Sequence, residues 1–304
     1  MRILITGGAG FIGSHLAEDL CDKHRVLVVD NLATGKIKNL QKVDVGFWEC
    51  GIERMASVNV DTKPADIIIH AAASYKDPNN WQSDIDTNVT GTANILKLAK
   101  MYGVKKIIYF QTSLCYGANP PEQPITVDCP INPAPNSYAI TKTAAEQLIQ
   151  MSGIPYVSFR LANCYGPRNL SGPPPTFFKK ISKGEDGFVV NTRRDYIYIK
   201  DLVNIVYNAV HQDITGVFHI ATGSDYSIEE IYREVADACH SSSEPQRLER
   251  GADDVPSILL DPLKTIRAFN YTCAHPLKDG IKKAVEWYYE NVVGETYTHL
   301  KEPK

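Results

Sequence analysis

Short apolar runs alternate with stretches of helical spacing along the first half of the chain. Each run is short enough for a buried strand, and polar or glycine-containing segments bound it. Strands that alternate with helices are joined by crossover connections, which produce a parallel sheet with helices on both faces. The pattern therefore predicts a doubly wound α/β domain. Its predicted strands are Arg2–Thr6, Val26–Asp30, Val45–Cys50, Asp66–His70, Lys106–Gln111 and Tyr156–Leu161.

The alternation of short apolar runs with helical stretches becomes weaker after residue 166. The segment 171–175 contains three prolines and a glycine, and the strand and helix signals beyond it are scattered. We therefore expect one domain over residues 1–166 and a smaller C-terminal α/β lobe over residues 167–304. A further apolar run, Val217–Ala221, has the pattern of a buried strand, so the segment near 195–221 is expected to return to the first sheet.

The overall composition is that of an ordinary globular protein, and it excludes several classes. The formal net charge of −3 and the pI near 6.2 provide no positive field for nucleic acid. No apolar run approaches the roughly 20 residues of a membrane-spanning helix, and no secretory leader is recognised. We therefore expect a cytoplasmic protein without a membrane partner. The seven cysteines lack Cys-x-x-Cys spacing, which predicts reduced thiols and no metal site.

Four glycines lie in the segment Thr6–Gly13 after the first predicted strand, and three of them, Gly7, Gly10 and Gly13, have the spacing of a phosphate-binding turn. Gly7 permits a tight turn, Gly10 lets backbone N–H groups approach a pyrophosphate, and Gly13 lets the next helix pack closely on the strand. The N-terminus of that helix is expected to face the phosphates. Glycines with this spacing between a strand and a helix are typical of a Rossmann-type dinucleotide-binding domain.

The second predicted strand ends at Asp30, and this acid indicates which dinucleotide binds. A carboxylate at that strand end accepts hydrogen bonds from the hydroxyls of the adenosine ribose and repels a 2′-phosphate. No arginine follows directly that would bind such a phosphate. The predicted cofactor is therefore NAD and not NADP.

Tyr138 and Lys142 lie four residues apart, on one face of a predicted helix that follows the fifth strand. Ligands of open α/β sheets bind at this carboxyl edge. To act as a base near neutral pH, a tyrosine has to lower its pKa by about 3 units from its usual value near 10. A nearby ammonium supplies ~1–3 units, so we expect Lys142 and the positively charged nicotinamide of NAD⁺ to activate Tyr138 together.

A residue with a hydroxyl group, Thr112, follows the strand Lys106–Gln111. At that strand end it is placed to donate a hydrogen bond to a substrate oxygen, beside Tyr138, as negative charge develops on that oxygen. Thr112, Tyr138 and Lys142 are therefore the predicted catalytic residues.

These motifs together resemble the extended short-chain dehydrogenase/reductase family, and within it the NAD-dependent nucleotide-sugar epimerases and dehydratases. The family implies a Rossmann-type doubly wound parallel sheet with a smaller C-terminal lobe that binds the nucleotide sugar. The resemblance extends from Met1 to about Asn270. The motifs that carry it are Thr6–Gly13, Asp30-Asn31, His70–Ala73, Asn88–Thr92, Thr112 with Tyr116-Gly117, Tyr138 with Lys142, Arg160–Arg168, and Arg194–Tyr196 leading to Asp201.

The resemblance implies a role for each matching residue. Tyr138 is similar to the family's catalytic base, Lys142 to the residue that holds the nicotinamide ribose, and Thr112 to the catalytic serine or threonine. Asn163 is similar to the asparagine at the diphosphate of the sugar nucleotide, and Arg194 to the arginine that binds the nucleotide phosphates. The implied NAD-binding residues are Gly7, Gly10, Phe11, Ile12, Gly13, Asp30, Asn31, Ile52, Ala71, Ala72, Ala73, Asn88, Tyr138 and Lys142.

Two departures from the family pattern concern the cofactor and the chemistry. Gly51 replaces the aspartate that usually touches the adenine, so we expect the adenine to be held more loosely. Ser113 and Leu114 replace the Asp-Glu pair that follows the catalytic threonine in the sugar-nucleotide 4,6-dehydratases. Because that pair supplies the acid and base of the dehydration, its absence argues against this reaction.

A third departure concerns the nucleotide. Arg250 resembles the arginine of the family's arginine-to-acid clamp, but its spacing from the acids is shifted by one residue. Either Asp253 or Asp254 is therefore the candidate partner. The implied substrate-binding residues are Thr112, Ser113, Tyr138, Asn163, Arg194, Arg250, Asp253 and Asp254.

The leading hypothesis is epimerisation at C4 of a nucleotide sugar, most simply a UDP-sugar, through a transient 4-keto intermediate. Tyr138 would take the proton of the C4 hydroxyl and NAD⁺ the hydride, and both would return after the sugar rotates. The alternatives on the same scaffold are a reductase of a keto sugar and an epimerase at C3 or C5. An alternative of another class is a non-catalytic dinucleotide-binding sensor or scaffold.

Two further expectations concern pathway and assembly. The segments Pro173–Phe178 and Ser257–Asp261 resemble epimerases encoded in bacterial surface-polysaccharide clusters, which favours a role in polysaccharide biosynthesis. The segments Asn88–Met101 and Ser137–Met151 have the pattern of long helices. In the family's dimers the outer faces of such helices pair across a two-fold axis, so we expect a homodimer.

Overall fold

A seven-stranded parallel sheet lies at the centre of the protein. In chain order its strands are β1 (Arg2–Thr6), β2 (Arg25–Asp30), β3 (Gly46–Glu49), β4 (Ile67–His70), β5 (Lys106–Thr112), β6 (Tyr156–Leu161) and β11 (Gly216–Ile220). They are arranged in the order β11-β6-β5-β4-β1-β2-β3. From β1 the chain adds β2 and β3 on one side, and it then adds β4, β5 and β6 on the other side. Ligands of such sheets bind at the carboxyl ends of the strands, where the strand order reverses between β1 and β4. The computed structural model describes residues 1–57, 65–75, 77, 79–250, 255–291 and 293–296.

The observed strands agree with the predicted ones to within one residue at each end, and the segment expected over Val217–Ala221 forms β11 beside β6. The sheet is parallel throughout, and helices cover both of its faces. The expected fold class, a doubly wound Rossmann-type α/β sheet with a smaller C-terminal part, is therefore confirmed.

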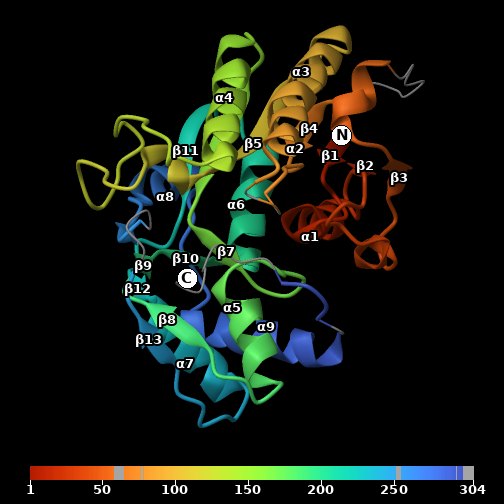
Figure 1. Cartoon of the computed structure of the whole chain (residues 1–304). Helices are drawn as coiled ribbons and strands as arrows, with labels where there is room; N and C mark the ends of the chain where they lie inside the picture. The colour runs from red at the N-terminus through yellow and green to blue at the C-terminus, as the bar shows by residue number, and fades with distance from the viewer. Residues whose placement is uncertain (58–64, 76, 78, 251–254, 292, 297–304) are drawn as a thin grey trace.

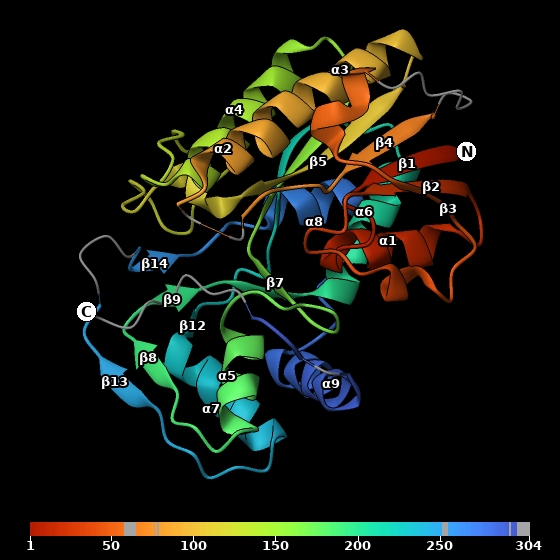
Figure 2. The same cartoon turned by 45° about the vertical axis from the view of Figure 1, so that its right-hand side comes forward.

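Helices pack on both faces of the sheet, as Figures 1 and 2 show. One face is covered by α1 (Phe11–Leu20) and α6 (Ile199–His211), with α8 (Leu263–Phe269) in the same core. The opposite face is covered by α3 (Thr92–Met101) and α4 (Ser137–Met151).

Alternate residues of each strand belong to different cores. In β1, Ile3 and Ile5 are buried in the core that includes α1, whereas Leu4 is buried in the core that includes α3. Successive side chains of a strand point to opposite faces, so a sheet covered on both sides needs apolar residues at nearly every position. This explains why continuous apolar runs marked the strands.

The helical stretch before β5 begins earlier than predicted. The sequence predicted a helix over Asn88–Met101, but α2 (Trp81–Asp84) and a π-helical turn (Ile85–Gly91) precede α3 without interruption. The apolar spacing did not mark this end because Trp81 is 67% exposed and belongs to no buried face. Turns of the π type often occur at functional sites, and this one contains Asn88.

The remaining elements form the smaller part of the molecule, below the sheet in Figure 2. Three helices make its core. Between the first and the second of these helices, the chain returns to the larger part to form α6 and β11. These helices are α5 (Pro173–Ile181), α7 (Ile228–Ala238) and α9 (Leu277–Glu290). The short strands form the pairs β7 (Asn163–Tyr165) with β10 (Tyr196–Tyr198) and β8 (Phe188–Val190) with β13 (Gln246–Leu248), and the group of β9 (Arg193–Arg194), β12 (Tyr226–Ser227) and β14 (Ser257–Ile258).

Three short 3-10 helices complete the framework: η1 (Ile37–Leu40), η2 (Ile52–Ser57) and η4 (Ser113–Tyr116). The last two follow β3 and β5 and so lie at the carboxyl edge of the sheet. Across the described part of the chain, no helix has the length and apolar character needed to cross a membrane.

Candidate active site

The glycine-rich turn connects β1 to α1 at the carboxyl edge of the sheet. Gly7 has a φ of +68°, and a Cβ there would lie 2.6 Å from the backbone nitrogen of Ala72. A Cβ on Gly13 would overlap the carbonyl oxygen of Gly7. Both positions therefore require glycine, the first for its backbone conformation and the second for the close approach of helix and turn.

The N-terminus of α1 provides backbone donors beside this turn. The first N–H groups of an α-helix have no partners within the helix, and the helix dipole adds positive potential there. The N-cap is Gly10, which has no side chain to accept from them, and Phe11 and Ile12 begin the helix. The glycine turn and the helix start together form a cradle that suits a pyrophosphate.

Asp30, the last residue of β2, is buried beside the turn, with 7% of its surface exposed. Its carboxylate accepts hydrogen bonds from the backbone N–H groups of Ala9 (2.9 Å) and Leu32 (2.8 Å). Burial raises the pKa of this carboxyl group. The neighbouring Asn31 accepts a hydrogen bond from the N–H of Ala33 (3.0 Å). Asp30 thus fastens the glycine turn to β2, and its carboxylate has about four acceptor sites in all, more than these backbone bonds use.

A chain of buried hydrogen bonds holds the end of β4. His70 bonds to the hydroxyl groups of Thr6 (2.7 Å) and Thr92 (2.9 Å). Burial lowers the pKa of His70 to about 3, so its ring is neutral near pH 7. The hydroxyl of Thr6 also accepts from the N–H of Ala72 (3.4 Å). These bonds place the predicted cofactor-binding segment Ala71–Ala73 against the glycine turn.

Asn88 links the segment after β4 to α4. Its side-chain oxygen accepts from the N–H of Ser74 (2.9 Å), and its amide donates to the carbonyl of Ser74 (3.1 Å) and to the hydroxyl of Thr141 (3.0 Å). The side chain is buried. Asn88 therefore holds the predicted cofactor edge beside α4, the helix with Tyr138 and Lys142.

Lys142 lies inside the protein, with 3% of its surface exposed. Its ammonium nitrogen is 4.1 Å from the centre of the Tyr109 ring, an arrangement that is attractive for a cation. Burial lowers the pKa of Lys142 to about 7, although the negative charge of Glu146 opposes this shift. Burial therefore disfavours the charged form of this lysine.

Tyr138 is in an environment that disfavours its phenolate. Burial raises its pKa, and Tyr75 and Asp84 raise it further. The sequence led us to expect that Lys142 lowers this pKa, and the protein's own groups do not produce that effect. The reason is that Lys142 is directed at the ring of Tyr109 and that burial disfavours its charged form.

Two of these neighbours were missed in the sequence. The rings of Tyr75 and Tyr138 are 6.5 Å apart, edge to face. Asp84 is 1% exposed and accepts a hydrogen bond from the hydroxyl of Ser137 (2.5 Å). Asp84 precedes Asn88 by four residues, so helical spacing would have placed both on one face. No local pattern marked Tyr75, because tertiary packing brings it to the site.

Thr112 ends β5 on the same edge of the sheet. Its hydroxyl oxygen accepts from the N–H of Leu114 (3.2 Å), so Thr112 is the N-cap of η4. Its own N–H donates to the side chain of Gln111 (2.8 Å). Ser113 is buried, and Leu114 packs against the core. The hydroxyl of Thr112 is thus fixed at a strand end beside α4.

Asn163 and Arg194 come from the short strands outside the sheet. The N–H of Asn163, the first residue of β7, donates to the carbonyl of Asp195 (3.0 Å). The guanidinium of Arg194, in β9, donates to the carbonyls of Arg193 (2.7 Å) and Pro256 (3.5 Å). Figure 2 shows these strands between the sheet and the helices of the smaller part.

Of the remaining predicted site residues, the structure describes Ile52 and Arg250 but not Asp253 and Asp254. Ile52 begins η2, is 3% exposed, and packs so closely against Gly91 that a side chain there would overlap it. Arg250 is exposed. Asp253 and Asp254 lie outside the described residues, so the clamp between Arg250 and one of these acids stays a prediction.

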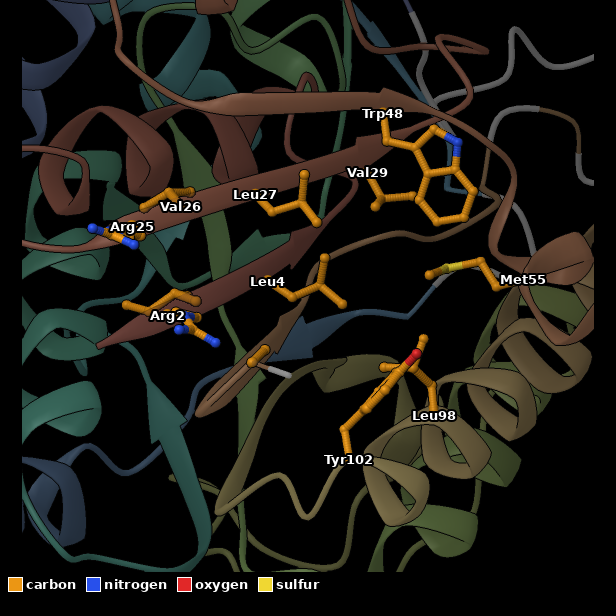
Figure 3. Close-up of a pocket in the computed structure, with 12 residues that line it drawn as sticks. Arg2, Leu4, Arg25, Val26, Leu27, Val29, Trp48, Met55, Leu98 and Tyr102 are labelled. Atoms are coloured by element: carbon orange, nitrogen blue, oxygen red, sulfur yellow. The ribbon is translucent and has the colours of Figure 1, made fainter. Parts of the chain in front are cut away.

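A cavity at a different place is drawn in Figure 3. It lies between α3 and the first three strands, where Leu4, Leu27 and Trp48 face Met55 and Tyr102. None of the predicted catalytic residues lines it. Within the described ranges, no group of three or more His, Cys, Asp or Glu residues is placed to hold a metal ion.

Comparison with known proteins adds information on the chemistry of this edge. The model of the family described as "NAD dependent epimerase/dehydratase family" matches residues 3–221. The Bordetella bronchiseptica enzyme WbmG, solved in complex with NAD and UDP, is 40% identical to this chain. The similarity covers 100% of this chain and 99% of that one, with a TM-score of 0.90.

Two curated relatives differ in the reaction that they are named for. UDP-glucose 4-epimerase of Mycolicibacterium smegmatis is 29% identical over 95% of this chain and 98% of its own length. UDP-N-acetyl-alpha-D-glucosaminuronate decarboxylase of Bacillus cytotoxicus is 30% identical, again over 95% of this chain and 98% of its own length. Both names specify a UDP-sugar, and one specifies an epimerisation and the other a decarboxylation.

Proposed function

Because this chain belongs to the NAD dependent epimerase/dehydratase family, we propose that it epimerises a UDP-sugar at C4. As a member of this family the protein is an enzyme that acts on nucleotide sugars, and its cofactor is NAD. One observation carries the narrower proposal. Thr112 ends β5, Tyr138 and Lys142 lie on α4, the long helix between β5 and β6, and neither of the two residues after Thr112 is an acid.

The residues around the turn fit NAD. Gly7 and Gly13 let the turn pack tightly against Ala72 and the start of α1, and Gly10 leaves the N-terminus of α1 without a capping side chain, so a pyrophosphate can approach its N–H groups. We assign the adenosine ribose to Asp30, whose carboxylate has acceptor capacity beyond its backbone bonds, and the nicotinamide ribose to Lys142. When bound, NAD supplies an acceptor for the C4 hydride, which it later returns, and a positive charge on its nicotinamide ring.

In this proposal Tyr138 takes the proton of the C4 hydroxyl and later returns it. Thr112 donates a hydrogen bond to the same oxygen and stabilises negative charge on it. Because burial, Tyr75 and Asp84 raise the pKa of Tyr138, its phenolate needs a cationic neighbour. Because Lys142 is directed at the ring of Tyr109 and burial disfavours its charge, we assign this role to the positively charged nicotinamide ring when NAD⁺ is bound.

We assign the nucleotide diphosphate to β7 and β9. Asn163 offers an amide, and Arg194 offers a guanidinium whose planar shape suits phosphate oxygens. The relative WbmG was solved with UDP bound, which supports uridine as the base. In this arrangement the sugar extends toward Thr112 and Tyr138, and Arg250 with Asp253 or Asp254 is the proposed clamp on the nucleotide.

A dehydration is disfavoured by the residues after Thr112. Ser113 is buried, Leu114 packs against the core, and neither side chain has a carboxyl group to replace the missing acid and base. The proposal is tested by incubating the purified protein with UDP-, GDP-, CDP- and dTDP-sugars without added NADH and identifying the products by NMR. We expect two UDP-sugars that differ only at C4 to interconvert. Loss of CO₂ from a UDP-uronic acid, or a product formed only when NADH is consumed, contradicts the proposal.

We also propose that two copies pair through the outer side of α3 and α4, which lie side by side in Figure 1. Large apolar side chains are exposed on α3, α4 and the helical turns that precede α3, and exposed apolar patches mark protein contacts. Light scattering is expected to give twice the chain mass of 33.8 kDa, and a monomer mass contradicts the pairing. The exposed side chains are Trp81 (67%), Ile85 (44%), Met101 (66%), Ile140 (51%) and Met151 (77%).

A further inference from the structure

One carboxylate near the cofactor edge has an oxygen without a partner. Glu53 is the second residue of η2, and its Oε2 is buried. Nothing in the described part of the chain donates a hydrogen bond to this oxygen. The other oxygen, Oε1, is 3.4 Å from Nε of Arg54, whose side chain is 80% exposed. A buried acceptor without a donor is costly, so Oε2 is poised for a ligand donor.

The carboxylate of Glu53 occupies the space beside Gly51. A Cβ built on Gly51 would lie 2.5 Å from both Cδ and Oε2 of Glu53. Glu53 can therefore reach this position only because residue 51 has no side chain. Glu53 thus places a carboxylate in the space that an aspartate side chain at residue 51, usual in the family, would occupy.

Hydrogen bonds connect the segment around Glu53 to β2 and to α3. The N–H of Cys50 donates to the carbonyl of Asp30 (3.0 Å), and the N–H of Arg54 donates to the carbonyl of Gly51 (3.0 Å). The side chain of Asn94, in α3, donates to the carbonyl of Glu53 (2.9 Å). The chain from β3 to η2, which carries Glu53, is therefore attached to the end of β2 at Asp30.

The direction of the dinucleotide follows from the order of the strands. The pyrophosphate cradle is at β1, and Thr112, Tyr138 and Lys142 are on the side of β4 and β5. The nicotinamide end extends to that side, so the adenosine end extends over β2 and β3. The base attached to a ribose at Asp30 then lies next to Glu53.

We propose that Glu53 binds the exocyclic amino group of the NAD adenine through its carboxylate. An ionised carboxylate only accepts hydrogen bonds, and the adenine amino group donates them. Hypoxanthine has a carbonyl oxygen in place of that amino group, so the same carboxylate repels it. The inference rests on NAD as the cofactor and not on epimerisation at C4.

The test compares NAD with nicotinamide hypoxanthine dinucleotide. Dissociation constants are measured by calorimetry after bound nucleotide has been removed, for the wild type and for Glu53→Ala and Glu53→Gln. Hydrogen bonds to charged groups are strong, so we expect Glu53→Ala to weaken NAD binding about 10-fold to 100-fold and to weaken binding of the hypoxanthine analogue far less. The control is Glu49→Gln, an exposed acid at the end of β3, which should change neither constant.

A second variant restores the acid at the neighbouring position. In Gly51→Asp/Glu53→Ala the Asp side chain has the space that Glu53 leaves, and we expect NAD binding to return to within about threefold of the wild type. Thermal unfolding of each variant shows whether it is folded. The proposal is overturned if Glu53→Ala and Glu53→Gln bind NAD as the wild type does, or if both dinucleotides weaken equally. Because the measurement is of binding alone, its outcome is independent of which reaction the enzyme catalyses.

Discussion

Glu146 on α4 and Arg160 on β6 form an ion pair of 3.1 Å in which the side chains are 1% and 4% exposed. Arg160 also donates to the hydroxyl of Tyr116 (2.7 Å), and the hydroxyl of Ser158 donates to the other oxygen of Glu146 (2.5 Å). Every charge in this cluster is therefore paired or hydrogen-bonded. The cluster fixes α4, the helix of the proposed catalytic residues, against the end of the sheet.

Removing the charge of Glu146 should destabilise the protein strongly. In Glu146→Gln the guanidinium of Arg160 stays buried without a carboxylate, and we expect the free energy of unfolding to fall by about 3–5 kcal/mol. Urea unfolding followed by circular dichroism measures this. The control is Glu185→Gln, which removes an ion pair of 3.8 Å with Lys183 that is about half exposed and should cost less than ~1 kcal/mol. Equal losses in the two variants would contradict the role of the buried pair.

Replacing Tyr138 by Phe should remove the proposed base while keeping the ring. We expect Tyr138→Phe to lower kcat by about 10²–10⁴-fold, the usual contribution of general acid–base catalysis. Turnover is followed by NMR of the sugar, and circular dichroism checks the fold. Tyr289→Phe, at a ring that is 60% exposed on α9, should leave kcat unchanged. A Tyr138→Phe enzyme within a few-fold of the wild type would contradict the assignment.

Three buried histidines should make the fold sensitive to mild acid. Burial lowers the pKa of His70 to about 3 and those of His15 and His219 to about 4. Below pH 6.5 the unfolded chain binds protons at these residues and the native state does not, so stability present above pH 6.5 is lost as the pH falls. Asp195 opposes the loss. Burial raises its pKa to about 6, so the native state binds a proton there at a higher pH than the unfolded chain does.

The pH effect is measured by urea unfolding between about pH 8 and pH 5 with saturating NAD. We expect little change above pH 7 and a decline below 6.5. His15→Gln should make the decline shallower by ~1.4 kcal/mol per pH unit, whereas His240→Asn, at an exposed position, should not alter it. An unchanged slope in His15→Gln would show that this histidine is not the group that titrates.

The positions of the strands and of the glycine turn could be predicted because local sequence determines them. Each central strand is buried on two faces and is therefore apolar along its length. Gly7 and Gly13 are required by a backbone angle and by a contact within the same turn. Short elements such as β9, with two residues, have no periodicity to recognise.

Other features depend on contacts between distant parts of the chain. Tyr75 and Asp84 act on Tyr138 through tertiary packing. The pKa of Lys142 falls because the fold buries it, whereas its sequence position suggested a charged partner for Tyr138. The sequence showed the acid missing at Gly51, but only the structure shows the carboxylate of Glu53 in that space.

The most direct test of C4 epimerisation is turnover of a UDP-sugar in D₂O by the purified protein without added nicotinamide cofactor. If the hydride leaves C4 and returns to C4 on the enzyme, no solvent hydrogen reaches the carbon. The account predicts the C4 epimer as the product, with no deuterium on any ring carbon by NMR and mass spectrometry. Deuterium at C3 or C5, release of CO₂, or a product formed only with stoichiometric consumption of added NADH would contradict it.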